Sequence, residues 1–155
     1  MMAMIGGITE LVLVVDDVPV CADFYERVVG LTPDETNGGT PSGVAEGARA
    51  WRDDWAWFWT GAVGSSVRLA LTTGPLFFQE KSPLPEGERF GRVHFAIEKP
   101  REEMAGAIAR LREHGVEVLM GEDGKPVRLE WMKAESVYFY DPAGNQAEFW
   151  SPDVG

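Results

Sequence analysis

Two copies of one order of elements lie in tandem along this chain, and this repetition restricts the possible folds more than any other feature. In the first copy, a β-branched run at 8–15 precedes a segment of helical periodicity, and strands are predicted at 54–60 and 67–73. The second copy predicts one strand, a helix and three further strands, at 92–97, 100–115, 116–120, 136–140 and 146–151. The order strand, helix, strands therefore occurs twice.

Residues with strong conformational preferences mark the helix boundaries. Asp17 is a preferred type of N-cap residue, Pro19 is tolerated in a first helical turn, and Gly30 is a natural stop. In the second copy, Pro100 opens the helix and Gly115 ends it. Both copies therefore predict one helix directly after their first strand.

The stretch between the two copies has the composition of a linker, because residues 75–90 are rich in proline. Residues 31–50, rich in Gly, Thr and Pro, indicate a loop with room for one short strand. A length of 155 residues with 45% apolar side chains suits one domain or two small modules. We expect a single domain over 1–155, with module one at 7–74, the linker at 75–90 and module two at 91–152.

Charge and cysteine content exclude several classes of protein. The formal net charge of -11 argues against nucleic-acid binding, which needs a surface rich in Lys and Arg. Acidity otherwise serves solubility or attracts a cation, and the charge alone does not choose between them. Cys21 is the single cysteine and has no internal disulfide partner. The sequence has no signal-like start and no run of about 18 apolar residues, so we expect a cytoplasmic protein without a membrane partner.

Three segments together resemble the vicinal oxygen chelate superfamily, which includes glyoxalases, bleomycin resistance proteins and extradiol dioxygenases. They are DVPVCADFYERVVG at 17–30, HFAI at 94–97 with the helix end LREHGVEV at 111–118, and YFYDPAGNQAEF at 138–149. The last is the most specific, because it joins a strand, a DPxGN turn and a strand that bears a carboxylate. The resemblance implies an α+β fold of two tandem βαβββ modules that form a glyoxalase-like half-barrel cleft. It also implies a small-molecule ligand, a homodimer and no organic cofactor.

In metal-using members of this superfamily, the ligands lie on the first and last strands of each module. The corresponding positions here are Glu10, Ala70 or its neighbour Arg68, His94 and Glu148. Family members usually have His or Gln at the first position and often Glu or Gln at the second, so this chain departs at both. The resemblance therefore implies a metal site made of Glu10, His94 and Glu148.

One imidazole and two carboxylates suit a divalent ion such as zinc, manganese, nickel or iron, with positions left open for substrate. Such a site would capture two neighbouring oxygens of a substrate and stabilise an oxyanion, with Glu148 as catalytic base. Strand alternation agrees, since it predicts that His94 and Glu148 lie on the polar faces of their strands. The alternatives are that His94 is a hydrogen-bonded packing residue and that Glu10 is a polar residue at a strand edge.

Four further residues are candidates for contact with the substrate. Trp57 and Trp59 share a strand face and would form an aromatic wall; the alternative is a buried sheet surface or a dimer contact. Arg68 would hold a carboxylate or phosphate, unless it is a surface arginine. Tyr138, in the third motif, completes the set.

Three functions remain open for this sequence. The first is a metal-dependent lyase, isomerase or dioxygenase that acts on a small oxygenated substrate. The second is a metal-free protein that binds a drug or another small ligand, as bleomycin resistance proteins do. The third is a regulatory or immunity module whose cleft is an interface. Fold alone does not choose a reaction, and metal analysis separates the first two.

Overall fold

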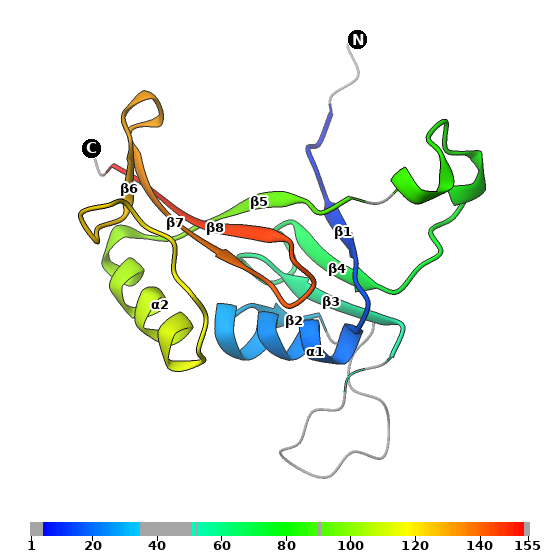
Figure 1. The fold of residues 1–155 in the computed structure, drawn as a ribbon, viewed down its shortest axis with the longest axis horizontal. Helices are drawn as coiled ribbons and strands as arrows, with labels where there is room; N and C mark the ends of the chain where they lie inside the picture. Colours follow the sequence, from blue (N-terminus) through cyan, green and yellow to red (C-terminus); the bar gives the residue numbers. More distant parts are fainter. Residues whose placement is uncertain (1–4, 35–50, 52, 90, 154–155) are drawn as a thin grey trace. The chain divides into compact units, whose positions relative to one another are not determined.

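The computed structural model describes residues 5–34, 51, 53–89 and 91–153. The chain separates into two compact units, Met1–Leu76 and Phe77–Gly155 (Figure 1). Each unit contains one four-stranded sheet and has the element order βαβββ. The predicted α+β class and the two tandem modules are thereby confirmed. Within the described part of the chain, no helix is both long and apolar enough to cross a bilayer.

The first unit contains a sheet with the strand order β1-β4-β3-β2. Its elements are β1 (Glu10–Val14), α1 (Val18–Asp23), a π-helical continuation (Phe24–Val29), β2 (Thr32–Pro33), β3 (Trp55–Trp59) and β4 (Arg68–Thr72). Strand β1 runs parallel to β4, and the other pairs are antiparallel. Strand β2 is the short strand expected within 31–50, and residues 35–50 lie outside the described residues.

The predicted limits of the first helix are confirmed. Asp17 has extended backbone angles, and its Oδ1 accepts a hydrogen bond from the Val20 amide at 3.0 Å, which satisfies a free N–H of the first turn. Gly30 ends the helical segment at φ 90°, a left-handed conformation that favours glycine. Helix α1 contacts β3 and β4, so one face of the sheet is covered. Ala56 and Phe58 are buried on that face.

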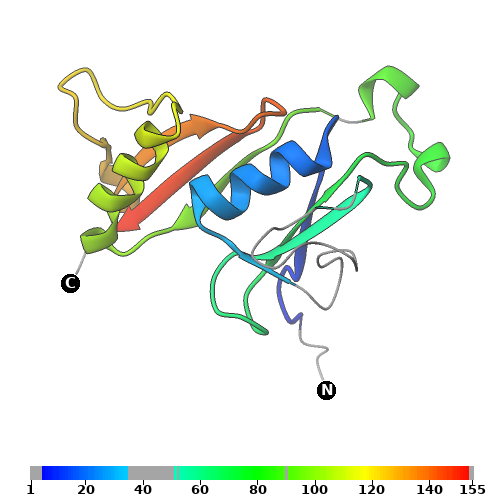
Figure 2. The ribbon, with the colours of Figure 1, turned by 90° about the horizontal axis from the view of Figure 1, so that it is seen from below.

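The second unit repeats this topology with the strand order β5-β8-β7-β6 (Figure 2). Its strands and main helix are β5 (His94–Glu98), α2 (Arg101–Glu113), β6 (Val127–Leu129), β7 (Ala134–Tyr140) and β8 (Gln146–Pro152). Three short 3₁₀ helices complete it, η2 (Gln79–Lys81), η3 (Glu86–Glu88) and η4 (Glu130–Met132). Strand β5 is parallel to β8, as β1 is to β4. Met104 and Leu111 of α2 are buried, as their spacing predicts.

The prediction of a strand at 116–120 is wrong. In that segment only Leu119 pairs, through an isolated antiparallel bridge with Tyr138. The chain turns sharply just afterwards, where the Gly121 amide donates to the Lys125 carbonyl at 2.8 Å. The edge of β7 is taken instead by β6, which the sequence reading assigned to no element. A turn that follows one residue after the bridge leaves no length for a ladder.

Candidate functional site

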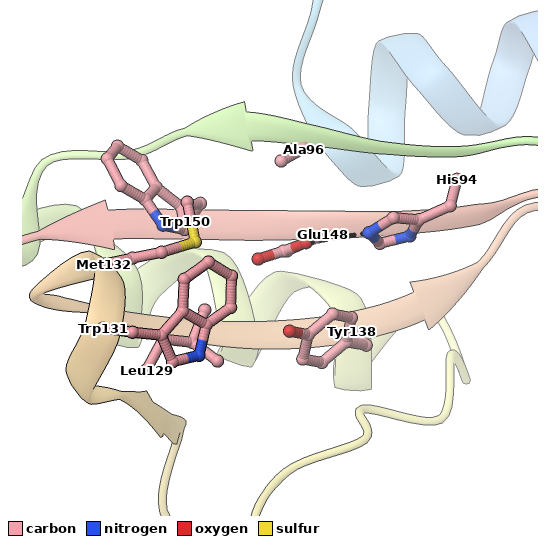
Figure 3. Close-up of a pocket in the computed structure, with 8 residues that line it drawn as sticks. All are labelled: His94, Ala96, Leu129, Trp131, Met132, Tyr138, Glu148 and Trp150. Atoms are coloured by element: carbon pink, nitrogen blue, oxygen red, sulfur yellow. Dashed lines mark ion pairs between the residues drawn. The ribbon is translucent and has the colours of Figure 1, made fainter.

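A hollow of about 540 Å³ lies on the sheet of the second unit (Figure 3). One end is polar and the other is apolar. Its lining residues come from β5, β6, η4, β7 and β8, and they are His94, Ala96, Leu129, Trp131, Met132, Tyr138, Glu148 and Trp150. The hollow therefore contains three predicted site residues together with five that were not predicted.

The turn between β7 and β8 places two of these residues side by side. Asp141 accepts hydrogen bonds from the Ala143 and Asn145 amides, and Asn145 Oδ1 accepts one from the Val93 amide at 3.1 Å. This last bond fixes the start of β5 beside the start of β8, so that Ala96 pairs with Glu148. The DPxGN motif therefore sets the register that brings His94 to Glu148.

His94 and Glu148 form the polar centre of the hollow. The distance between His94 Nε2 and Glu148 Oε2 is 3.0 Å. The Glu148 side chain is only 8% exposed, whereas that of His94 is half-exposed. Ser136 is fully buried, and its hydroxyl donates a short hydrogen bond to Glu148 Oε1. A buried carboxylate with a donor on one oxygen and an imidazole on the other has a fixed orientation.

Tyr138 lies beside this pair on β7, directly opposite Glu148. Its ring stacks on the ring of His94, with centroids 6.0 Å apart. Burial, and next the negative charge of Glu148, raise the pKa of Tyr138 above its ordinary value of 10.0. The phenol therefore stays protonated at neutral pH and can donate a hydrogen bond.

The apolar wall of the hollow consists of residues that sequence reasoning missed, which are Leu129, Trp131, Met132 and Trp150. Trp131 belongs to η4 and is 81% exposed, so its ring stands at the surface. Trp150 follows Glu148 by two positions on β8, and its buried indole N–H has no hydrogen-bond partner among the described residues. Period-two spacing from Glu148 could have identified Trp150. Nothing in the sequence marked η4.

In the first unit, Arg68 lies among aromatic residues. Its guanidinium carbon is 4.9 Å from the ring centre of Trp57 and 5.6 Å from that of Trp59. Its Nη1 donates to Asp34 Oδ2 at 3.3 Å, and the Asp34 side chain is only 2% exposed. Trp57 and Trp59 are half-buried on the sheet face opposite Ala56 and Phe58. Asp34 was not predicted as a partner of Arg68, because 34 residues separate them.

Glu10 is the first residue of β1 and lies directly opposite Arg68 in the register. Its carboxylate oxygen Oε1 is buried and has no hydrogen-bond partner among the described residues. Over the described ranges, no group of three or more His, Cys, Asp and Glu side chains is arranged to hold a metal ion. Two predicted ligands, His94 and Glu148, are in contact within the second unit, and Glu10 belongs to the first unit.

Comparison with known proteins places the chain in a family. Residues 7–149 match the model of the Glyoxalase/Bleomycin resistance protein/Dioxygenase superfamily. The chain belongs to this superfamily. The resemblance inferred from the three sequence motifs is thereby confirmed.

Proteins similar to this chain carry names that describe different functions. A catechol-2,3-dioxygenase of Bacillus subtilis is 35% identical over 91 residues, which are 58% of this chain and 28% of that protein. The antibiotic-binding protein TnmS3 from a Streptomyces species has a TM-score of 0.62 at 20% identity, over 98% of this chain and 100% of that one. A fosfomycin resistance protein of Listeria monocytogenes, solved with Mn(II) and a dihydroxypropylphosphonic acid, has a TM-score of 0.61 at 17% identity, over 97% and 95%.

The two solved structures share the fold of this chain. The part of this chain that aligns with the Bacillus subtilis dioxygenase spans 28% of the length of that protein.

Proposed function

We propose that this protein is a divalent-metal-dependent enzyme of the glyoxalase superfamily that acts on a small oxygenated substrate, as a lyase, isomerase or dioxygenase. The proposed ligands are Glu10, His94 and Glu148. The observation that carries the proposal is the contact between His94 and the buried carboxylate of Glu148 in the wall of the hollow. Both residues occupy ligand positions implied by the superfamily.

The donor atoms fit a divalent ion of the zinc, manganese, nickel or iron type. Imidazole nitrogen and carboxylate oxygen are ordinary ligands of these metals. Glu148 has a buried hydrogen bond from Ser136, the kind of outer partner that orients metal ligands. The buried Oε1 of Glu10 accepts no hydrogen bond from the residues that the structure describes, and such burial is costly unless a cation or a donor satisfies the oxygen. These features support all three residues as ligands.

A bound divalent ion would supply Lewis acidity toward two neighbouring oxygens of the substrate. In the proposed reaction, Glu148 accepts a proton as the base. Tyr138 remains protonated and donates a hydrogen bond to a substrate oxygen. The apolar wall beside Trp131 and Trp150 excludes water from the substrate's carbon framework. Arg68, Trp57 and Trp59 stay proposed substrate contacts, with Arg68 directed toward an anionic group.

Metal analysis tests this proposal. The chain is produced in medium supplied with zinc, manganese, nickel and iron, and the metal content of the purified protein is measured. We expect near-equimolar metal, which Glu10→Ala, His94→Ala and Glu148→Ala each lose. His114→Ala serves as the control, because His114 contacts a backbone carbonyl at the end of α2 and lines no part of the hollow. A wild-type protein without metal after such growth contradicts the proposal.

The apolar half of the hollow favours a second candidate, a metal-free protein that binds a small ligand. Four of its eight lining residues are Leu129, Trp131, Met132 and Trp150, which offer a surface for a planar molecule. The likeness to an antibiotic-binding protein agrees with it at the level of fold. Tight quenching of tryptophan fluorescence by a cationic aromatic drug in metal-free protein, lost in Trp131→Ala, supports this candidate.

A further inference from the structure

Arg68 and Glu10 are neighbours that form no ion pair with each other in the described structure. They lie directly opposite in the parallel pair β1/β4, so both side chains project from the same face of the sheet. Opposite charges at paired positions attract, and a buried carboxylate oxygen beside an arginine would ordinarily accept a hydrogen bond. Glu10 Oε1 is nevertheless buried without a partner within the described chain.

The contacts of Arg68 explain this arrangement. In the sheet order β1-β4-β3-β2, Arg68 has Glu10 on one side and the strand of Trp57 and Trp59 on the other. The guanidinium lies over both indole rings and reaches Asp34, the residue directly after β2. The arginine therefore extends across β3, away from β1.

We propose that Asp34, with the rings of Trp57 and Trp59, is a positioning device that holds Arg68 off Glu10 and so keeps the Glu10 carboxylate vacant for a cation. This inference rests on the proposed function, in which Glu10 is a metal ligand. It explains how a chain with arginine near a superfamily ligand position retains an acidic ligand. Arg68 pairs with Asp34 Oδ2, so the negative charge of Glu10 is left for the ion.

The first test measures binding of Mn(II) or Zn(II) alone by titration calorimetry. Asp34→Asn removes the charge with little change in shape and frees Arg68 to pair with Glu10. We expect metal affinity to fall about tenfold or more, the size of effect seen when an outer partner of a metal ligand is lost. The double variant D34N/R68M recovers the wild-type affinity. Unchanged affinity in D34N, or a double variant as weak as D34N, overturns the inference.

A second variant distinguishes the proposed effect from a folding defect in D34N. Trp59→Leu removes one ring beneath the guanidinium and leaves Asp34 in place. It should weaken metal binding in the same direction and by less, and R68M should again restore it. Trp55→Leu is the comparison on the same face of β3, because Trp55 stacks on Trp57 and not on the guanidinium itself, so it should weaken metal binding by less than Trp59→Leu does. An equal loss in W55L and W59L contradicts a specific role for the ring under Arg68.

A metal-independent measurement separates this inference from the proposed function. The effect of Glu10→Gln on the denaturation midpoint is measured with Arg68 and with R68M, in wild-type and D34N backgrounds. With Asp34 present, we expect Glu10→Gln to change the denaturation midpoint equally whether residue 68 is Arg or Met. In D34N, we expect Glu10→Gln to lower the midpoint more with Arg68 than with R68M. A coupling between Glu10 and Arg68 that appears only in D34N supports the inference, even if the wild-type protein binds no metal. In that case only the proposed function fails. Equal effects in both backgrounds overturn the inference.

Discussion

Glu148 is held from two sides by residues of its own unit. Ser136 donates to one carboxylate oxygen, and His94 lies against the other. Both partners occupy strands adjacent to β8 in the same sheet, so the backbone ladder fixes their positions. At the scale of residues, the chemistry proposed for Glu148 therefore depends on a hydroxyl that lies outside the sequence motifs.

Ser136→Ala is expected to weaken metal binding about 10–100-fold, because it removes the donor that orients Glu148. Calorimetric titration with Zn(II) or Mn(II) measures the change. Ser151→Ala is a matched control on the same sheet, since the Ser151 hydroxyl is buried and has no hydrogen-bond partner among the described residues. An equal loss of affinity in the two variants contradicts the assigned role of Ser136.

Asn145→Ala is expected to destabilise the protein by about 1–3 kcal/mol, since it removes the side-chain acceptor of the Val93 amide and the hydrogen bond from Asn145 Nδ2 to Asp141 Oδ2. Urea denaturation measures the loss. Asp123→Ala is the comparison, because Asp123 also accepts a turn amide but is exposed, and it should change stability by less than about 0.5 kcal/mol. A loss as small as that of the control would show that the turn does not hold β5 in register.

At the scale of elements, an ion network ties the end of the second sheet to its helix. Arg101, the first residue of α2, pairs with Glu135 on β7 and with Asp153 just after β8. Arg128 on β6 donates two hydrogen bonds of 2.6 Å to the Asp153 carboxylate. The network therefore joins α2, β6, β7 and the end of β8.

The hydrogen bonds from Arg128 hold the pKa of Asp153 at about 2, below its ordinary value of 3.8. Because this pKa is lowered by folding, the stabilisation is complete above pH 3.8 and is lost as the pH falls toward 2. Asp153→Asn is expected to lower the denaturation midpoint at neutral pH, with the difference from wild type closing between about pH 4 and 2. A difference that persists at pH 2 contradicts this role.

The sequence predicted elements well where periodicity and end signals agreed. The alternation of tryptophans at 55–59, Asp17 as the N-cap and the DPxGN turn all match the structure. It failed at 116–120, where an alternating apolar pattern forms one bridge, and at β6, which has only three residues. Such short pairings depend on the edge of β7 and contain too few residues to show a periodic pattern.

The candidate site was predictable in part for the same reason. His94, Tyr138 and Glu148 belong to motifs and lie together. Trp131 and Met132 line the hollow because they belong to η4, a short helix that local sequence patterns do not predict. The contact of Arg68 with Asp34 joins distant residues that no local pattern links.

At the scale of the whole molecule, we expect a homodimer, as the superfamily resemblance implies. The neighbouring side chains of Phe77 and Phe78 are 97% and 76% exposed, an apolar surface that association would remove from water. Sedimentation equilibrium should give twice the 17.1 kDa of one chain, and F77S/F78S should shift the population toward monomer. A monomeric wild type at high concentration contradicts the prediction, and an unchanged dimer in F77S/F78S shows that another surface associates.

The two sheets share one strand order, and each closes its own hydrogen-bond ladder with its first strand parallel to its last. Among the described strands no ladder joins the two sheets, so a substitution that disturbs the pairing in one sheet is not transmitted to the other through backbone hydrogen bonds. Substitutions at Glu10 or Arg68 therefore leave intact the strand pairing that holds His94 beside Glu148.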